Sequence, residues 1–244
     1  MTTLNPATQP QPEAGDPLPR RTAQVRSMEL AGPAGRLEAV LNQGSEQARF
    51  AALVCHPHPL CGGTLHNKVV YHAMKVLNDA AWGFEFPVLR FNFRGAGLSQ
   101  GTHDGEAEAG DVLAALRWLE TEFKLPIVAA GFSFGAAMTL SALNCPDAPS
   151  SVKAVACLGL PLEAECRQYT YPGLANLKLP KLFLSGDSDQ FAPASELAWV
   201  TAQAAEPKQM ALIQDADHFF TGQMEQFQQT LAGWLVEYCH DPGR

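Results

Sequence analysis

The feature that most constrains the fold is a five-residue stretch, Gly-Phe-Ser-Phe-Gly, at positions 131–135. A short apolar run at 126–130, typical of a buried strand, comes directly before it. A segment of helical composition at 136–143 comes directly after it. So short a connection must turn sharply at Ser133, and glycines two residues to either side leave room for the neighbouring strand and helix. We therefore expect a buried strand, a tight turn and a helix here.

Apolar runs alternate with helical segments along most of the chain. The pattern predicts strands at 23–30, 36–41, 50–55, 86–93, 128–132, 152–160, 181–185 and 210–213. It predicts helices after a cap at Asn67 and at 104–123, 136–143, 194–205 and 222–238. Continuous apolar strands that alternate with helices are typical of a parallel sheet with helices on both faces. The predicted fold class is α/β, with an antiparallel hairpin formed by the first two strands.

Length and charge limit the number of domains and the kinds of partner. A chain of 244 residues with 46% apolar residues can build one substantial core. The net charge is −8 and no run of Lys and Arg occurs, which argues against nucleic-acid binding. No stretch approaches the roughly 20 apolar residues of a membrane span, so we expect no membrane partner. The sequence does not indicate an oligomeric state.

The first 24 residues differ in composition from the rest. Residues 1–24 are rich in Pro, Gln, Thr and Ala, and they lack the cationic start and apolar block of a secretory signal. We expect a disordered leader here and a single domain at 25–244.

The cysteine pattern indicates a reducing compartment. No Cys-x-x-Cys pair occurs, and several cysteines lie in apolar segments. We therefore expect buried free thiols in a cytoplasmic protein. The six are Cys55, Cys61, Cys145, Cys157, Cys166 and Cys239.

A Gly-x-Ser-x-Gly sequence between a strand and a helix is the nucleophile-elbow arrangement, which exposes the serine Oγ above the sheet. A serine hydroxyl needs an adjacent base, and histidine is suited because its ordinary pKa is near 6.5. We predict His218, in the loop after the last strand, as the base for Ser133. The other histidines lie before the turn or at the chain end. The alternative is that His218 is a polar loop residue without a catalytic role.

The base also needs a carboxylate that fixes its tautomer. Asp187 and Asp189 both follow the strand at 181–185. We favour Asp189, because its position carries the carboxylate past the strand end toward the histidine loop, and Asp187 is the alternative. The aspartate that is not used is expected to hold the turn by accepting backbone N–H groups. The order Ser133, Asp189, His218 is that of the elbow's own fold.

An oxyanion needs hydrogen-bond donors, and the backbone N–H of Phe134 is one candidate. The second is expected in the loop at 56–63, where Pro57 and Pro59 have no N–H. His58 and Leu60 are the nearest residues with a usable N–H, and we prefer His58.

Two nearby segments allow other interpretations. The first, at 55–66, contains residue types that bind metals. Its two prolines restrict the loop and its spacing matches no zinc signature, so we expect no metal. The second, at 94–99, is rich in glycine but lacks a phosphate-binding motif. We expect Arg94 to tie loops together, and Asp104 and Asp111 to cap or flank the next helix in a solvated role. The ligand types in the first segment are Cys55, His56, His58, Cys61 and His66.

From about residue 25 onward the chain resembles the α/β-hydrolase superfamily. The motif H-P-H-P-x-x-G-G-x-x-x-N-K from His56, the sequence F-N-F-R-G-A-G at 91–97 and G-F-S-F-G at 131–135 look like those of small, cap-less bacterial serine hydrolases related to dienelactone hydrolases. Dienelactone hydrolase itself has a cysteine at the position of Ser133, so lactone specificity is not carried over. The segment at 161–179 is too short for a full cap, and we expect it to line one wall of an open pocket.

The resemblance implies a Ser133–Asp189–His218 triad, no cofactor and a small-molecule ester or thioester substrate. The expected function is hydrolysis of carboxylic esters through an acyl-enzyme intermediate. The alternatives are a thioesterase or peptidase with the same triad, and a non-catalytic binding relative of the fold.

Overall fold

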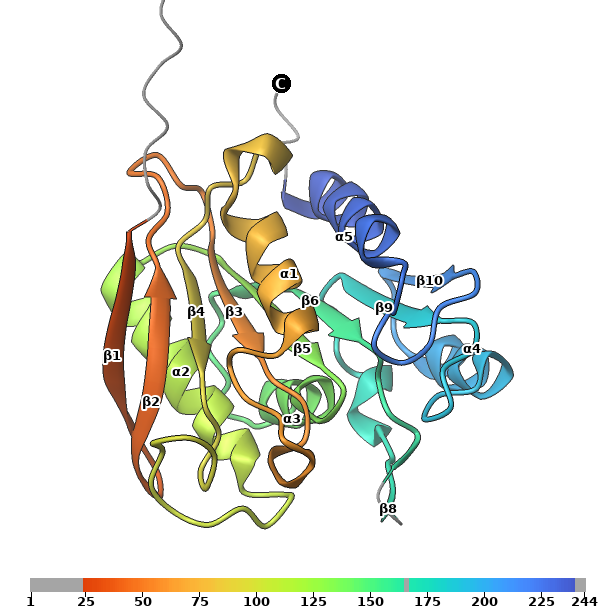
Figure 1. The fold of residues 1–244 in the computed structure, drawn as a ribbon, viewed down its shortest axis with the longest axis horizontal. Helices are drawn as coiled ribbons and strands as arrows, with labels where there is room; N and C mark the ends of the chain where they lie inside the picture. The colour runs from red at the N-terminus through yellow and green to blue at the C-terminus, as the bar shows by residue number, and fades with distance from the viewer. Residues whose placement is uncertain (1–23, 165–166, 240–244) are drawn as a thin grey trace, which may run out of the picture.

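One eight-stranded sheet organises the computed structural model, which describes residues 24–164 and 167–239 (Figure 1). Its strand order is β1-β2-β4-β3-β5-β6-β9-β10. Strand β2 pairs antiparallel with β1 and β4, and all other neighbours pair in parallel. The strands are β1 (Val25–Gly32), β2 (Gly35–Asn42), β3 (Ala51–Cys55), β4 (Val88–Phe91), β5 (Ile127–Phe132), β6 (Val152–Leu158), β9 (Lys181–Gly186) and β10 (Lys208–Ile213). The predicted α/β class and opening hairpin are confirmed.

Helices cover both faces of this sheet. Helices α1 and α5 pack on one face, and α2, α3 and α4 pack on the other (Figure 1). In β3, Leu53 belongs to the core beneath α2 and α3, whereas Val54 belongs to the core beneath α1 and α5. This alternation explains why the strand is apolar throughout, since each face meets a helix layer. The helices are α1 (Lys68–Asn78), α2 (Glu108–Phe123), α3 (Phe134–Leu143), α4 (Ala194–Gln203) and α5 (Met224–Cys239).

Helix α1 begins as predicted, but α2 begins four residues later than predicted. Before α2, the side chain of Asp104 accepts hydrogen bonds from the N–H groups of Glu106 and Ala107. The carboxylate of Glu108 accepts the N–H groups of Asp104 and Gly105. These hydrogen bonds form a turn where we expected the first turn of the helix, because the side-chain oxygens accept backbone N–H groups of residues that precede the helix. Asp104 therefore flanks the helix, as one of the two expected roles, and its carboxylate caps the turn before the helix rather than the helix itself.

The segment between β6 and β9 has more regular structure than the short loop that we expected. It contains the two-residue strands β7 (Glu163–Ala164) and β8 (Arg167–Gln168) and the 3-10 helix η3 (Pro172–Ala175). The hydroxyl of Tyr171 donates to the carbonyl of Pro161. Its ring packs against the core, whereas Arg167 of the same segment lines a cavity, as expected of the segment. The segment remains much smaller than a cap domain.

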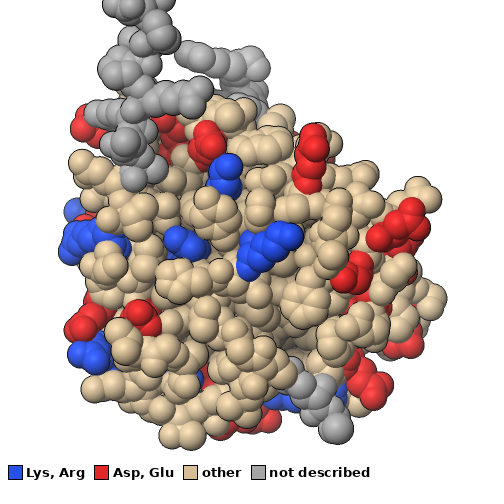
Figure 2. All heavy atoms as spheres, viewed as in Figure 1, with Lys and Arg blue, Asp and Glu red and all other residues tan. Residues whose placement is uncertain are grey.

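The described surface carries charges of both signs. On the face shown in Figure 2, Lys and Arg side chains are separated by uncharged surface and form no continuous patch. None of the described helices combines the length and the hydrophobicity that a bilayer crossing requires. The leader predicted for residues 1–24 lies, apart from Gln24, outside the described residues.

Cys55, Cys145, Cys157 and Cys239 are free thiols. Cys55, Cys157 and Cys239 are buried as predicted, whereas Cys61 is exposed and Cys145 partly exposed. Cys166 lies outside the described residues.

Candidate active site

Ser133 lies on the connection between β5 and α3, at the carboxyl edge of the parallel strands. Its backbone has φ +54° and ψ −121°, a conformation that residues with a side chain rarely adopt. A Cβ on Gly131 would lie 2.4 Å from the backbone of Gly135, and a Cβ on Gly135 would lie 2.5 Å from the carbonyl oxygen of His56. The two glycines are therefore required by close backbone approach, as the sequence predicts.

His218 and Asp189 come together from two loops that follow neighbouring strands. Asp189 follows β9, His218 follows β10, and the imidazole Nδ1 lies 2.8 Å from the carboxylate Oδ2. Both side chains are buried, at 2% and 0% exposed. The ring of His218 packs against Phe132, with centroids 5.0 Å apart, which places it beside the residue that precedes Ser133. The structure thus gathers all three predicted residues at one edge of the sheet.

The carboxylate of Asp189 accepts three hydrogen bonds. Besides the imidazole, they come from the hydroxyl of Ser185 at 2.8 Å and the N–H of Phe191 at 2.9 Å. Burial by itself raises the pKa of Asp189, but the hydrogen bonds and the charge of His218 outweigh it and lower the pKa below its ordinary value. Asp189 is therefore held as a carboxylate that orients the imidazole.

Asp187 is exposed and does not contact His218 within the described structure. Its carboxylate accepts a hydrogen bond from the hydroxyl of Ser188. The expectation that the second aspartate holds the turn through backbone N–H groups is therefore wrong. Asp189 does this itself, because it accepts the N–H of Phe191 while it holds the histidine.

The loop after β3 brings the side chain of His58 into contact with that of Phe134, the other residue predicted to supply an oxyanion donor. The ring of His58 lies edge-on to the ring of Phe134, with centroids 5.0 Å apart. Phe134 is the first residue of α3, and the structure records no acceptor for its N–H among the described residues. The N–H of Leu60 donates to the ring of His58, so it is already engaged. Leu60 is therefore less suited to donate to an oxyanion.

Two of the considered metal ligands serve the fold instead. His56 is fully buried: its Nε2 accepts the N–H of Phe93, so its Nδ1 carries the proton and donates to the carbonyl of Pro57. Burial lowers the pKa of His56 to about 4 and raises the pKa of Cys55 to about 12. Within the described ranges, no three His, Cys, Asp or Glu side chains group in a way that could hold a metal.

Arg94 ties two segments together as predicted, but its partner corrects another expectation. The guanidinium donates from Nε and Nη2 to the two oxygens of Asp111, at 3.0 and 2.7 Å. The backbone N–H of Arg94 also donates to this carboxylate. Asp111 is fully buried, so its predicted solvated role is wrong. The pattern misleads because an aspartate in the first turn of a helix is usually a solvated cap.

Sequence reasoning missed a second pair of histidine and carboxylate. The Nδ1 of His103 lies 2.7 Å from the carboxylate of Glu108, and both side chains are buried. The ring of His103 contacts the rings of His58 and Phe134, with centroids 4.5 and 5.4 Å apart. The pair comes from the turn before α2, and the five-residue separation within a polar stretch gives no signal of burial.

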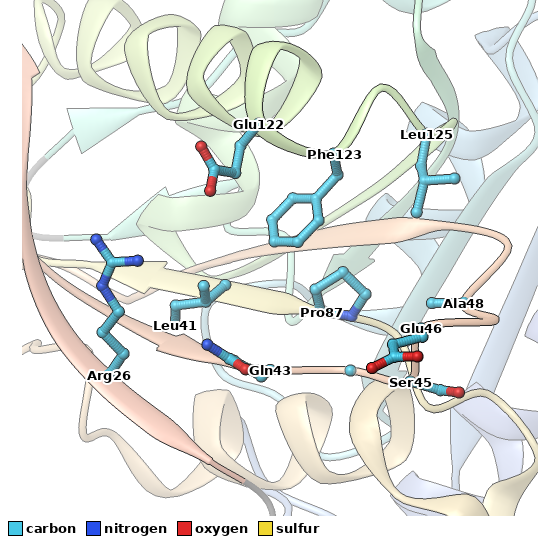
Figure 3. A pocket seen from close by; sticks show the side chains of 11 residues that line it. Arg26, Leu41, Gln43, Ser45, Glu46, Ala48, Pro87, Glu122, Phe123 and Leu125 are labelled. Carbon is cyan, nitrogen blue, oxygen red and sulfur yellow. The ribbon is translucent and has the colours of Figure 1, made fainter.

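Two cavities lie at opposite edges of the sheet. One of about 390 Å³ is lined by His58, His103 and Arg167, among others, beside the predicted oxyanion residues. The other, of about 360 Å³, lies where β3, β4 and β5 begin, with Phe123, Leu125 and Pro87 on its walls (Figure 3). The first cavity lies at the same sheet edge as Ser133, and His58 on its wall contacts Phe134, the residue after Ser133.

Comparison with known proteins decides the family. The profile of the alpha/beta hydrolase domain matches residues 68–235. The chain belongs to the α/β-hydrolase family. An uncharacterised protein of Rickettsia prowazekii is 32% identical over 216 residues, which are 84% of this chain and 86% of the relative.

Solved structures extend the likeness of this α/β hydrolase to nearly the whole fold. An alpha-beta serine hydrolase homologue from Coxiella burnetii is 31% identical, with a TM-score of 0.75 over 85% of this chain and 96% of the other. A serine hydrolase without a lid from Xanthomonas campestris is 25% identical, with a TM-score of 0.77 over 90% and 97% of the two chains. An esterase of Pyrococcus furiosus, 17% identical with a TM-score of 0.73 over 89% and 94%, shares the fold. The predicted hydrolase fold without a large cap is confirmed.

Proposed function

We propose that this α/β hydrolase cleaves carboxylic esters through an acyl-enzyme intermediate, with Ser133 as nucleophile, His218 as base and Asp189 as orienting acid. The observation that carries the proposal is the buried hydrogen bond between His218 and Asp189, beside the strained turn that carries Ser133. Strain of this kind costs about 1–3 kcal/mol and persists where a function requires it. The serine hydrolases among the structural relatives support the same reaction class.

In the first half of the reaction, the Oγ of Ser133 attacks the ester carbonyl while its proton passes to Nε2 of His218. The tetrahedral intermediate collapses, the bond to the alcohol breaks, and the alcohol leaves with that proton. A water then attacks the acyl-enzyme, again losing a proton to His218, and the carboxylic acid departs as Ser133 regains its hydrogen. Asp189 accepts the Nδ1–H throughout and stays ionised, which its lowered pKa favours.

The negative charge of the tetrahedral intermediate needs fixed donors. We assign the N–H groups of Phe134 and His58 to this role, because the two residues are neighbours at the Ser133 turn. A single donor of this kind contributes about 10²- to 10³-fold to turnover.

The test uses a fluorophosphonate probe, which modifies activated serines, followed by peptide mapping. A single adduct on Ser133 in the folded protein, absent after heat denaturation and absent in Ser133→Ala, is the expected result. Matched panels of esters, thioesters and anilides then rank the substrate classes, and we expect esters to react fastest. A folded protein that takes no adduct and hydrolyses no panel member would contradict the proposal and favour a binding role for the fold.

A further inference from the structure

The cavity beside the oxyanion residues has one wall from each of three segments. The 3-10 helix η1 (Pro59–Cys61) and His58 form the first wall, the turn containing His103 forms the second, and Arg167 of β8 forms the third. His58 lines this cavity and contacts Phe134, the residue after Ser133, so the cavity lies beside the proposed oxyanion site. A substituent of the bound ester can therefore extend into it.

Arg167 is held in a fixed orientation at this wall. Its Nη1 donates to the carbonyl oxygen of Gly105, and its guanidinium carbon lies 4.9 Å above the ring of Tyr169. A guanidinium has five N–H donors, so one bond to Gly105 leaves donors for a ligand. The side chain is 38% exposed, so these donors are accessible. A pre-oriented arginine of this kind suits two-point recognition of a carboxylate.

The other charges around the cavity already have partners. The carboxylate of Asp104 accepts two N–H groups of its own turn, and that of Glu108 is buried against His103. Glu106 lies 3.9 Å from the guanidinium, but its side chain is 86% exposed and its charge is screened by water. Among the described residues that line the cavity, Arg167 is the only lysine or arginine.

His103 adds a second polar group to the same cavity. Its Nδ1 faces Glu108, which leaves Nε2 as the ring nitrogen available to a bound molecule. Its ring also packs against His58, so the imidazole is held in place from two sides. The cavity therefore combines a fixed cation with a fixed imidazole next to the proposed oxyanion site.

We propose that this cavity is a subsite for an anionic substituent and that Arg167 makes the enzyme prefer esters that carry a carboxylate. This inference rests on the proposed ester hydrolysis and specifies its substrate class. The carboxylate can belong to the acyl part or to the alcohol part of the ester. Arg167 is thus a specificity-determining residue, whereas Ser133, His218 and Asp189 perform the reaction on either kind of substrate.

Matched substrates separate these contributions. The mono-4-nitrophenyl ester of succinic acid is compared with 4-nitrophenyl butyrate, and 3-acetoxybenzoate is compared with phenyl acetate. In one pair at least, we expect Arg167→Gln to lower kcat/KM for the anionic ester tenfold or more, chiefly through KM, and to change the neutral ester less than twofold. Arg167→Lys should restore part of the preference, since it keeps the charge but loses the two-point geometry. Arg117→Gln, at an exposed ion pair with Asp147, is the matched control and should change neither.

A binding measurement separates this proposal from the catalytic one. Calorimetry with succinate and with succinamide is done on Ser133→Ala, with and without Arg167→Gln. We expect succinate to bind, succinamide to bind at least fivefold more weakly, and Arg167→Gln to remove the difference. Equal effects of Arg167→Gln on anionic and neutral ligands would overturn the anionic subsite even if neutral esters are hydrolysed. Arg167-dependent binding of succinate by a protein that hydrolyses no ester would support the subsite and contradict the proposed reaction.

Discussion

At the scale of single residues, Ser133 combines a chemical role with an unfavourable backbone. Its φ of +54° suits glycine, yet only a serine supplies the hydroxyl. We expect Ser133→Gly to be more stable than Ser133→Ala by about 1 kcal/mol, because glycine relieves the strain that alanine keeps. Urea unfolding of the two variants measures the difference, and both should lack hydrolytic activity. An alanine variant as stable as the glycine variant would show that the turn is not strained.

The two aspartates after β9 differ in their contacts, so their substitutions should differ in effect. Asp189→Asn keeps the shape but removes the charge that faces Nδ1 of His218, and we expect turnover to fall by about 10⁴-fold. Asp187→Asn should stay within a few-fold of the wild type, because the only hydrogen bond recorded for the Asp187 carboxylate among the described residues comes from the adjacent Ser188 hydroxyl. Steady-state hydrolysis of 4-nitrophenyl acetate measures both. The opposite ranking would move the orienting role to Asp187.

The burial of His56 predicts that the free energy of unfolding depends on pH. Its pKa is about 4 in the folded protein, lowered by burial from 6.5. Because the unfolded chain binds the proton more readily, the free energy of unfolding has its full value above pH 6.5. It decreases as the pH falls from 6.5 through 4. The shift corresponds to about 3 kcal/mol of the free energy of unfolding. Urea unfolding between pH 7 and pH 4 should be less pH-dependent in His56→Gln than in the wild type.

His72 provides the control for this pH prediction. Burial also lowers the pKa of His72, but its side chain is much less buried than that of His56. His72→Gln should therefore keep most of the wild-type pH dependence. An unchanged slope in His56→Gln would mean that His56 is not the group responsible.

At the scale of elements, the ion pair between Arg94 and Asp111 fastens the loop after β4 to helix α2. Both side chains are nearly fully buried, so neither can be left without its partner. We expect Asp111→Asn to lower the free energy of unfolding by about 3–5 kcal/mol, because a buried cation loses its counter-charge. Urea unfolding measures this loss. The double variant Arg94→Met with Asp111→Leu should lose less than the single variant, and a larger loss would contradict this explanation.

Helix α2 also shows where sequence patterns fail. The later start of α2 and the burial of Asp111 and Glu108 both arise from side chains that bond to backbone or to distant partners. Helical periodicity reports which face is apolar, but it does not report which carboxylates meet a buried cation or N–H group. These details needed the packed structure.

At the scale of the whole molecule, one sheet is shared by two helical layers. Trp118 of α2 packs against the core on one face, and Trp234 of α5 is buried in the core on the other. We expect the two layers to unfold together, as a single domain at 25–244 requires. In a variant that keeps only Trp118 and in one that keeps only Trp234, with the chain's other tryptophans replaced by phenylalanine, urea midpoints from fluorescence and from far-UV circular dichroism of the same variant should coincide. Midpoints that differ by more than experimental error would divide the domain.

The sequence by itself determined the α/β class, the opening hairpin and the tight turn at Ser133 between a strand and a helix, because strand periodicity and the glycine pattern are local properties of the chain. The sequence also favoured Asp189 over Asp187, and it is Asp189 that contacts His218 in the structure. Only the tertiary structure decided that Asp111 pairs with Arg94, that His56 is a buried neutral imidazole, and that Arg167 meets His58 and His103 at one cavity. These residues are brought together from segments far apart in the sequence, and their roles follow from burial and partners that no local pattern encodes.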